Sequence, residues 1–272
     1  MSWLNQVDLS LITTCLYILT GAFAGFAAGL LGIGGGLIIV PVLYFIFSAQ
    51  GYDQQYLMHM ALTTSLATIV FTSISSTLAH HKKHAVLWRL VFLLSPGIII
   101  GSWFGGKFAS VMDTEILGSF FAVFELLVAI NLLLKKQSRQ HQIKINKAIA
   151  TTGGIVIGFV STVVGIGGAT MTVPFLHWFN VSIRNAVATS AACGFPIALF
   201  GTLSFIYASW DQHLFSATSI GYLQLHALLI IATSSFIFAP LGAKLAHTIS
   251  EKTLRLVFAF ILLTLSITMF SV

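Results

Sequence analysis

Two glycine clusters carry the most suggestive chemistry in this chain of 272 residues. The first reads Gly-Ile-Gly-Gly-Gly over 32–36 and the second Gly-Ile-Gly-Gly over 165–168, and a Val-Pro pair follows each of them, ending at Pro41 and Pro174. Glycine allows positive φ and lets a ligand approach the main chain closely. A helix that starts after such a cluster presents unpaired N–H groups and the positive end of its dipole. The pattern therefore favours an anion site built from main-chain donors.

The two prolines fit two accounts of these sites. Either each proline opens a short helix at its first position, or it lies one turn in and leaves the carbonyl of Leu37 or Thr170 without a helical partner. The alternative for the glycines is that they only permit close helix packing. Because the cluster occurs twice, each time before a short apolar run, we favour the binding site. The residues expected to line it are Gly34, Gly35, Gly36, Gly167 and Gly168.

Hydroxyl side chains open the apolar run that follows each short segment. They are Thr64 and Ser65 in the first case and Thr189 and Ser190 in the second. Such groups can donate hydrogen bonds to a bound oxyanion. They can equally bond across helices or back to carbonyls of their own helix, which is common in membrane bundles. The sequence leaves both roles open.

One acidic residue, Glu125, lies at the centre of the apolar run 116–134. An ionisable group at that depth in a bilayer is expensive and is by default a functional hypothesis. Glu125 is therefore a candidate for proton coupling. The alternative is a neutral carboxyl group that is hydrogen-bonded to a nearby hydroxyl or carbonyl.

The histidines at 80, 81 and 84 have a spacing that resembles a metal site. We do not expect a metal there, because Lys82 and Lys83 repel a cation and no Cys or carboxylate is near. A solvated turn is the simpler interpretation. The sequence predicts no metal site, no catalytic residue and no cofactor.

Composition defines the elements that must position these residues. Apolar residues make up 57% of the chain and charged residues 7%, far below the quarter that a soluble domain carries. Most of the apolar runs reach the ~20 residues that cross a bilayer as a helix. They lack the short alternating strands of a barrel, so we expect an all-α polytopic membrane protein. The ten runs are 11–31, 37–47, 58–79, 88–110, 116–134, 149–165, 169–179, 186–208, 222–245 and 254–271.

Two of these runs, 37–47 and 169–179, are too short to cross a bilayer, since 11 residues of helix span about 16 Å. They follow the two glycine clusters, whose flanking sequences align at an offset of 133 residues. The chain therefore reads as a tandem duplication of five segments, with repeats at 1–140 and 141–272. We expect the short helices to meet near the bilayer midplane.

Basic residues predict how the two repeats are oriented. If the repeats are inverted, 12 of the 13 Lys and Arg residues fall on one side, whereas a parallel arrangement leaves 8 of 13 together. The positive-inside rule therefore favours inverted repeats with both termini outside. It also accounts for the net charge of +6 without a nucleic acid partner.

The duplicated glycine cluster with Val-Pro, the Ala-Thr-Ser of 188–190, its Thr-Thr-Ser partner at 63–65, and the His- and Lys-rich turn before Trp88 resemble the TauE/SafE family of membrane anion transporters. The resemblance covers nearly the whole chain. It implies export of sulfite, organosulfonates or related sulfur-containing anions across the bacterial inner membrane. It places the glycines and the Thr/Ser pairs at the anion site. Ala169 stands where the first cluster has Gly36, so the two half-sites need not contribute equally.

The prediction is therefore a secondary transporter of small anions rather than an enzyme. No GxxxxGK[ST] phosphate loop occurs, so the chain does not itself use ATP, and neither HExxH nor GxSxG occurs. A membrane assembly factor or an intramembrane enzyme remains the alternative. The expected partners are a small anion, protons and the lipid bilayer, and the sequence leaves open whether the chain forms a homo-oligomer.

Overall fold

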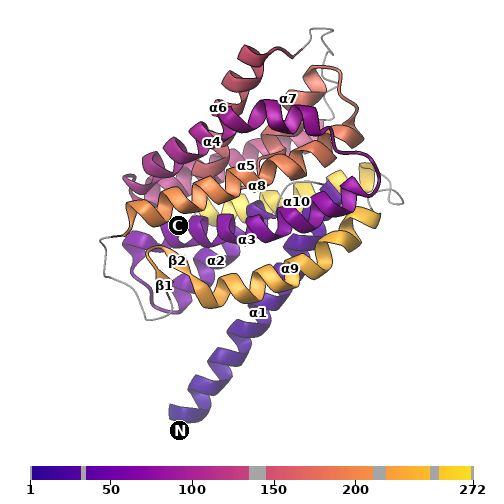
Figure 1. Cartoon of the computed structure of the whole chain (residues 1–272). Coiled ribbons are helices and arrows are strands. Elements are labelled where there is room, and N and C mark those ends of the chain that lie inside the picture. The colour runs from indigo at the N-terminus through magenta and orange to yellow at the C-terminus, as the bar shows by residue number, and fades with distance from the viewer. Residues whose placement is uncertain (1, 32–34, 135–144, 211–218, 246–250, 271–272) are drawn as a thin grey trace.

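The computed structural model describes residues 2–31, 35–134, 145–210, 219–245 and 251–270 and is almost entirely helical (Figure 1). These residues also form a 3₁₀ turn, Gln54–Tyr56, and a short hairpin of β1 (Ser219–Ile220) and β2 (Leu223–Gln224). The all-α prediction is confirmed. The helices are α1 (Ser2–Leu31), α2 (Gly36–Ala49), α3 (Leu57–His81), α4 (Trp88–Ser110), α5 (Thr114–Leu134), α6 (Lys147–Val163), α7 (Ala169–Trp178), α8 (Ile183–Ala208), α9 (Leu225–Leu245) and α10 (Glu251–Phe270).

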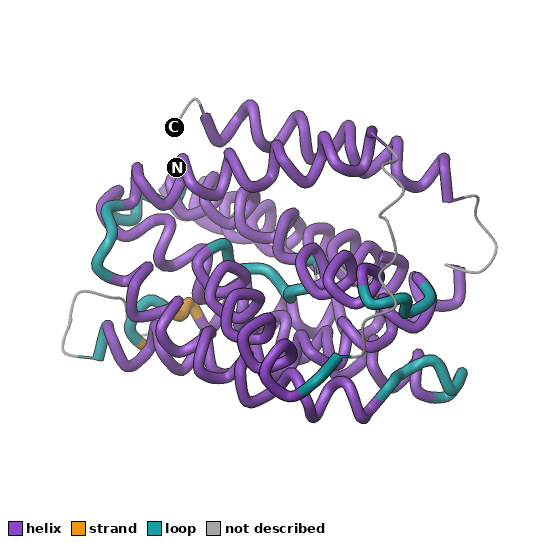
Figure 2. Tube along the Cα trace, turned by 90° about the horizontal axis from the view of Figure 1, so that it is seen from above, coloured by secondary structure: helices purple, strands orange, loops and turns teal. Residues whose placement is uncertain are grey.

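Six helices of the described residues are long and apolar enough to cross a bilayer. They are α1, α3, α4, α5, α8 and α9. Figure 2 shows the long helices lying side by side, with connections at both ends of the bundle. Many large apolar side chains on their outer faces are exposed, as expected of surfaces in contact with lipid. The polytopic membrane architecture that composition predicts is therefore confirmed.

Rows of glycine bring two pairs of helices into backbone contact. On α1, a Cβ added at Gly25 would lie 2.5 Å from the carbonyl oxygen of Ser235 on α9, and one at Gly29 would overlap Ala239. On α4, a Cβ at Gly101 would overlap the backbone of Ile155 on α6. Small residues let membrane helices approach this closely. In both pairs the residue numbers rise together along the contact, so α1 runs parallel to α9, and α4 parallel to α6.

Helices α3 and α8 cross the centre of the bundle in opposite directions. A Cβ at Gly194 on α8 would lie 3.5 Å from the Cβ of Ser73, and one at Gly201 would lie 3.1 Å from Leu66. The numbers rise on α8 as they fall on α3, which makes the two helices antiparallel. Helix α3 is also bonded to α9, where the Ser75 hydroxyl donates to the carbonyl of Phe236 at 2.8 Å.

Basic side chains gather at one end of the bundle. The turn between α3 and α4 holds Lys82 and Lys83, and the Lys83 amine lies 3.5 Å from the carbonyl of Ala243 near the end of α9. Arg184 lies at the start of α8, which reaches the same end because α8 is antiparallel to α3. Figures 1 and 2 place the start of α1 and the end of α10 at the opposite end, where the β1–β2 hairpin lies.

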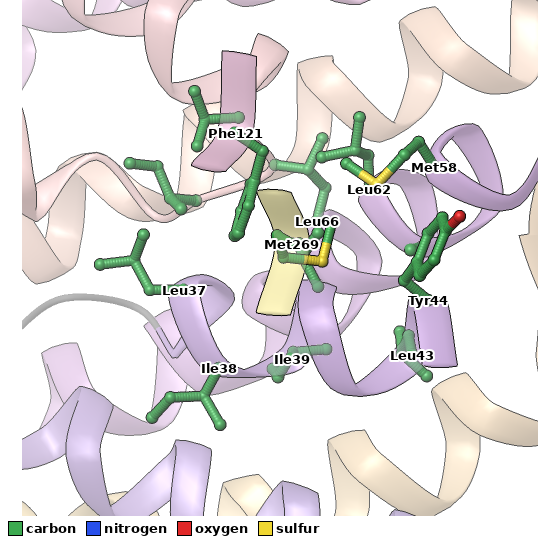
Figure 3. Packing of buried hydrophobic residues seen from close by; sticks show 14 of the residues in the cluster. Leu37, Ile38, Ile39, Leu43, Tyr44, Met58, Leu62, Leu66, Phe121 and Met269 are labelled. Atoms are coloured by element: carbon green, nitrogen blue, oxygen red, sulfur yellow. The ribbon is translucent and has the colours of Figure 1, made fainter. Parts of the chain in front are cut away.

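The larger of the apolar clusters surrounds α2. Figure 3 shows Leu37 and Ile39 of α2 among Leu66 of α3, Phe121 of α5 and Met269 of α10. A second cluster joins α4, α6, α7 and α8. Helix α2 is thus enclosed by α1, α3 and α10, whereas α7 packs on α6 and α8.

Accessibility of single cysteines tests which end of the bundle faces the cytoplasm. In a chain without Cys15 and Cys193, we expect Gln54→Cys to react with a membrane-impermeant maleimide on intact cells. Lys82→Cys, at the basic end, is expected to react only after permeabilisation, because cytoplasmic loops carry the excess of Lys and Arg. The reverse labelling pattern would contradict this orientation.

Candidate anion-binding site

Helices α2 and α7 start from glycines with the same left-handed conformation. Gly35 has φ 76° and ψ −11°, and Gly168 has φ 79° and ψ −10°. The carbonyl of Gly35 accepts from the N–H groups of Ile38 and Ile39 in α2, both at 3.0 Å. The carbonyl of Gly168 accepts in the same way from Met171 at 3.1 Å and Thr172 at 2.7 Å. Any residue with a side chain would be strained at this positive φ, which explains why glycine occupies both positions.

Both helices begin halfway across the bundle. Gly36 lies against Ile69, near the middle of α3, and Gly168 lies against Ile197, near the middle of α8. A Cβ at Gly35 would lie 2.9 Å from the carbonyl of Ala24, so the chain has turned back from the end of α1 before α2 starts. The positive ends of both helix dipoles therefore point into the protein interior at mid-depth. This arrangement can attract an anion where a continuous helix could not.

The first residue of α2 meets the glycine loop that precedes α7. A Cβ built at Gly36 would overlap the carbonyl of Gly165 and would lie 2.8 Å from the Cα of Ile166. The Ser65 hydroxyl on α3 donates to the same Gly165 carbonyl at 3.0 Å. The loop before α7 also touches α8, because a Cβ at Gly194 would lie 3.0 Å from the carbonyl of Gly167. Of the predicted glycines, Gly36 touches the loop that precedes α7 at Gly165, whereas Gly35 lies against Ala24 and Gly168 against Ile197. Gly34 lies outside the described residues.

The prolines occupy the interior of both short helices. Pro41 is the sixth residue of α2 and Pro174 the sixth residue of α7. Of the two accounts that the sequence allows, the structure selects the one with proline one turn in. The carbonyls of Leu37 and Thr170 therefore lack the helical donor that any other residue would supply.

The four predicted hydroxyls all lie buried at hydrogen-bond distance from protein groups. Thr64 accepts from the N–H of Gln224 at 3.2 Å, just before α9, and Thr189 accepts from the N–H of Leu87 at 3.1 Å, just before α4. Ser190 donates to the carbonyl of Val187 at 2.7 Å. The matched bonds of Thr64 and Thr189 tie α3 and α8 to the helices that start beside them. Contact of any of the four with a ligand remains a prediction.

Glu125 is fully buried on the face of α5 that packs against α10. The two helices are joined one turn away, where the Ser266 hydroxyl donates to the carbonyl of Ala122 at 2.9 Å. Neither carboxylate oxygen of Glu125 has a hydrogen-bond partner among the described residues. Such a group is unfavourable unless it is neutral or meets a transient partner. The alternative role, a carboxyl group bonded to a nearby hydroxyl or carbonyl, therefore has no supporting contact in the described part of the chain.

Three buried polar residues were not singled out from the sequence, one near the start of α3 and two beside Gly168. The ring of His59 on α3 lies 4.9 Å from the ring of Tyr222 and is 3% exposed. Ser161 and Thr172 are fully buried beside Gly168. An ionisable residue inside an apolar run was a signal for His59. No spacing rule connects Ser161 with Thr172, because the loop that joins them places them together only in three dimensions.

The histidine turn carries ordinary contacts. The indole N–H of Trp88 donates to Nδ1 of His81 at 3.1 Å, and the two rings meet edge to face. Among the described residues no group of three His, Cys, Asp or Glu side chains could hold a metal ion.

Comparisons with known proteins identify relatives along nearly the whole chain. The family model described as "Sulfite exporter TauE/SafE" matches residues 17–269. A "Probable membrane transporter protein" of Haemophilus influenzae is 38% identical over 94% of this chain and 97% of its own length. Proteins of that name from Methanocaldococcus jannaschii and Bacillus subtilis are 29% and 27% identical, and each match covers 91% of this chain. The Methanocaldococcus protein is covered over 91% of its length and the Bacillus protein over 94%. No solved structure matches the chain significantly.

Removing the Ser65 hydroxyl tests whether it serves the fold or a ligand. We expect Ser65→Ala to lower the free energy of unfolding by about 1–3 kcal/mol, because the buried Gly165 carbonyl loses a donor. Ser110→Ala is a matched control, since the Ser110 hydroxyl bonds only within α4 and is exposed. Thermal unfolding in detergent measures the difference. Unchanged stability together with weaker anion binding would instead assign Ser65 to the ligand.

Proposed function

Because the chain belongs to the TauE/SafE family and is a membrane transporter, we propose that it exports small anions, with sulfite, sulfonates and related sulfur-containing anions as substrates. The family description names sulfite, and the relatives are named only as transporters. The site supports an anion independently of these names. It offers main-chain N–H groups and hydroxyls at mid-depth, and these are donors suited to oxyanions.

One observation carries the proposal, namely two half-length helices that both start in mid-bundle, with the first residue of α2 touching the loop that precedes α7. Backbone groups that face hydrocarbon cost several kcal/mol each, so such ends persist only inside protein or beside a wet cavity. Paired, Gly/Pro-interrupted helices in corresponding positions of two halves are the usual construction of a transporter's substrate site. The matched φ and ψ of Gly35 and Gly168 fit that construction.

We also propose that residues 1–140 and 141–272 are inverted repeats in the inner membrane, with both termini outside. Helix directions support this, because α1 opposes α6, α3 opposes α8 and α4 opposes α9 along the contacts described above. In inverted-repeat transporters, alternating access arises when one repeat moves against the other around a fixed site. The loop contact between Gly36 and Gly165 lies where such a site is required.

Proton coupling is proposed for Glu125. Among the residues whose burial the structure describes, its carboxyl group is the one buried acidic side chain. Helix α10 covers it, and α10 also packs against α2, whose N-terminus forms half of the site. Binding or release of a proton at Glu125 is thus positioned to bias the packing of α5 and α10 around α2.

Flux in proteoliposomes tests the transporter against the alternatives of an assembly factor or an intramembrane enzyme. We expect the purified protein to move sulfite or a sulfonate, and Gly35→Val or Gly168→Val to abolish the flux. Gly51→Val is a matched control, because Gly51 has φ 77° but lies in an open loop with nothing within 4 Å of an added Cβ. It imposes the same backbone strain away from the site.

The outcomes of that experiment separate the hypotheses. Flux that survives in both site variants contradicts an anion site at the glycine loops. Absence of flux from the folded wild-type protein with any sulfur oxyanion contradicts export itself and favours an assembly role.

The pH dependence of flux tests Glu125. We expect Glu125→Gln to flatten the dependence of the transport rate on the proton gradient, since the amide cannot exchange a proton. Glu115→Gln, on the exposed first turn of the same helix, is expected to leave it unchanged. Initial rates are measured in liposomes with imposed pH differences. A Glu125→Gln protein with the wild-type pH profile would remove Glu125 from the mechanism.

A further inference from the structure

Buried hydroxyls lie on both sides of the loop before α7. Ser161 and Thr162 at the end of α6 and Thr172 in α7 are fully buried, and their oxygens have no hydrogen-bond partner among the described residues. A Cβ built at Gly168 would lie 3.5 Å from Oγ of Ser161 and 3.6 Å from Oγ1 of Thr172. Two unpaired hydroxyls from different helices thus flank the residue that caps α7.

The positions that correspond to Ser161 and Thr172 in the first half of the chain carry no hydroxyl. At the offset of 133 that aligns the two glycine clusters, Ser161 corresponds to Ala28 and Thr172 to Ile39. The small cavity beside Gly35 is lined by carbon, from Ala27, Gly35, Leu37, Ile38, Phe258 and Leu262. Figure 3 shows the apolar side chains that crowd around α2. The two half-sites share a backbone but differ in chemistry.

A buried hydroxyl without a partner is unfavourable, and most buried polar groups in proteins are satisfied. Two of them beside one helix N-terminus therefore point to a ligand that the site binds at another stage. The N–H groups of Ala169 and Thr170 add to this set, because the first residues of a helix have no acceptor in a preceding turn. Together they surround Gly168 with donors from α6 and from α7.

We propose that the anion binds on one side only, at the N-terminus of α7, between Ser161, Thr172 and the first N–H groups of the helix. The start of α2 then supports this site through the contact of Gly36 with Gly165 and binds no substrate itself. This inference rests on the proposed anion transport and specifies which half of the site carries it.

The charge of the site indicates the class of anion. Along α6, α7 and α8 the basic side chains are Lys147, His177 and Arg184, all near the basic end of the bundle and away from Gly168. The donors at the site are therefore neutral. The cost of removing an ion from water rises steeply with its charge, so neutral donors favour a singly charged oxyanion over a doubly charged one. A sulfonate fits this description, whereas sulfate does not.

Ile197 closes the site in the conformation described here. Its Cδ1 atom occupies the position that a Cβ at Gly168 would take. The atom is the far end of a flexible side chain, so rotation of Ile197 can open space beside both hydroxyls. In the described conformation Ile197 therefore covers the site.

Calorimetric titration of the purified full-length protein with methanesulfonate and with sulfate tests the inference. We expect methanesulfonate to bind at least about tenfold more tightly than sulfate. Ser161→Ala and Thr172→Val should each weaken methanesulfonate binding by about tenfold or more, the loss expected for one hydrogen bond to a charged group. Thr172→Ser, which keeps the hydroxyl, should retain binding.

Ser76→Ala is the matched control, since Ser76 is also buried and unpartnered but lies on α3. It should bind methanesulfonate as the wild type does. Elution as a single species and the unfolding temperature without anion show that each variant is folded.

Two outcomes would overturn the inference in distinguishable ways. If the wild type transports sulfonate while Ser161→Ala and Thr172→Val bind it normally, the one-sided site is wrong and the proposed transport stands. If the folded wild type neither binds nor transports any of these anions, the proposed function fails and this inference fails with it.

Discussion

Backbone hydrogen bonding in a bilayer is the constraint on which this structure depends. A polar main-chain group that faces hydrocarbon costs several kcal/mol, so a helix that ends in mid-membrane must be enclosed by protein. The fold meets this demand with α3 and α8, the antiparallel pair that flanks the two glycine loops. The glycine rows of α1 and α4 draw α9 and α6 close enough to complete the enclosure. The helix starts of α2 and α7 are thereby kept away from lipid.

The starts of α2 and α7 share a backbone conformation but differ in the side chains around them. Gly35 and Gly168 have nearly the same φ and ψ, yet apolar side chains surround the first and hydroxyls the second. Packing follows the same division, because α10 covers α2 while α7 lies against α6 and α8. Two copies of a repeat can keep the same backbone geometry, because unpaired main-chain groups are costly in a bilayer, while their side chains diverge. Structural support and ligand contact can then be assigned to different copies.

Much of the fold could be predicted from the sequence, because long apolar runs have one solution in a bilayer. The predicted run 88–110 has the bounds of α4, and 169–179 ends one residue beyond α7. The glycine clusters implied a left-handed backbone, but only the structure shows that Pro41 lies inside α2 rather than at its start. Ser161 and Thr172 could not be found in this way. They lie on opposite sides of a loop, and only the fold shows that both face Gly168.

The contact between Gly36 and Gly165 has a mechanical consequence. A Cβ at Gly36 would overlap the carbonyl of Gly165, so the two main chains touch and α2 cannot move toward Gly165 without displacing it. A displacement of α2 toward one compartment is therefore transmitted directly to the segment that precedes α7. In the proposed transport cycle the two half-length helices would therefore move together, and this joint movement would keep the pathway from opening to both compartments at once.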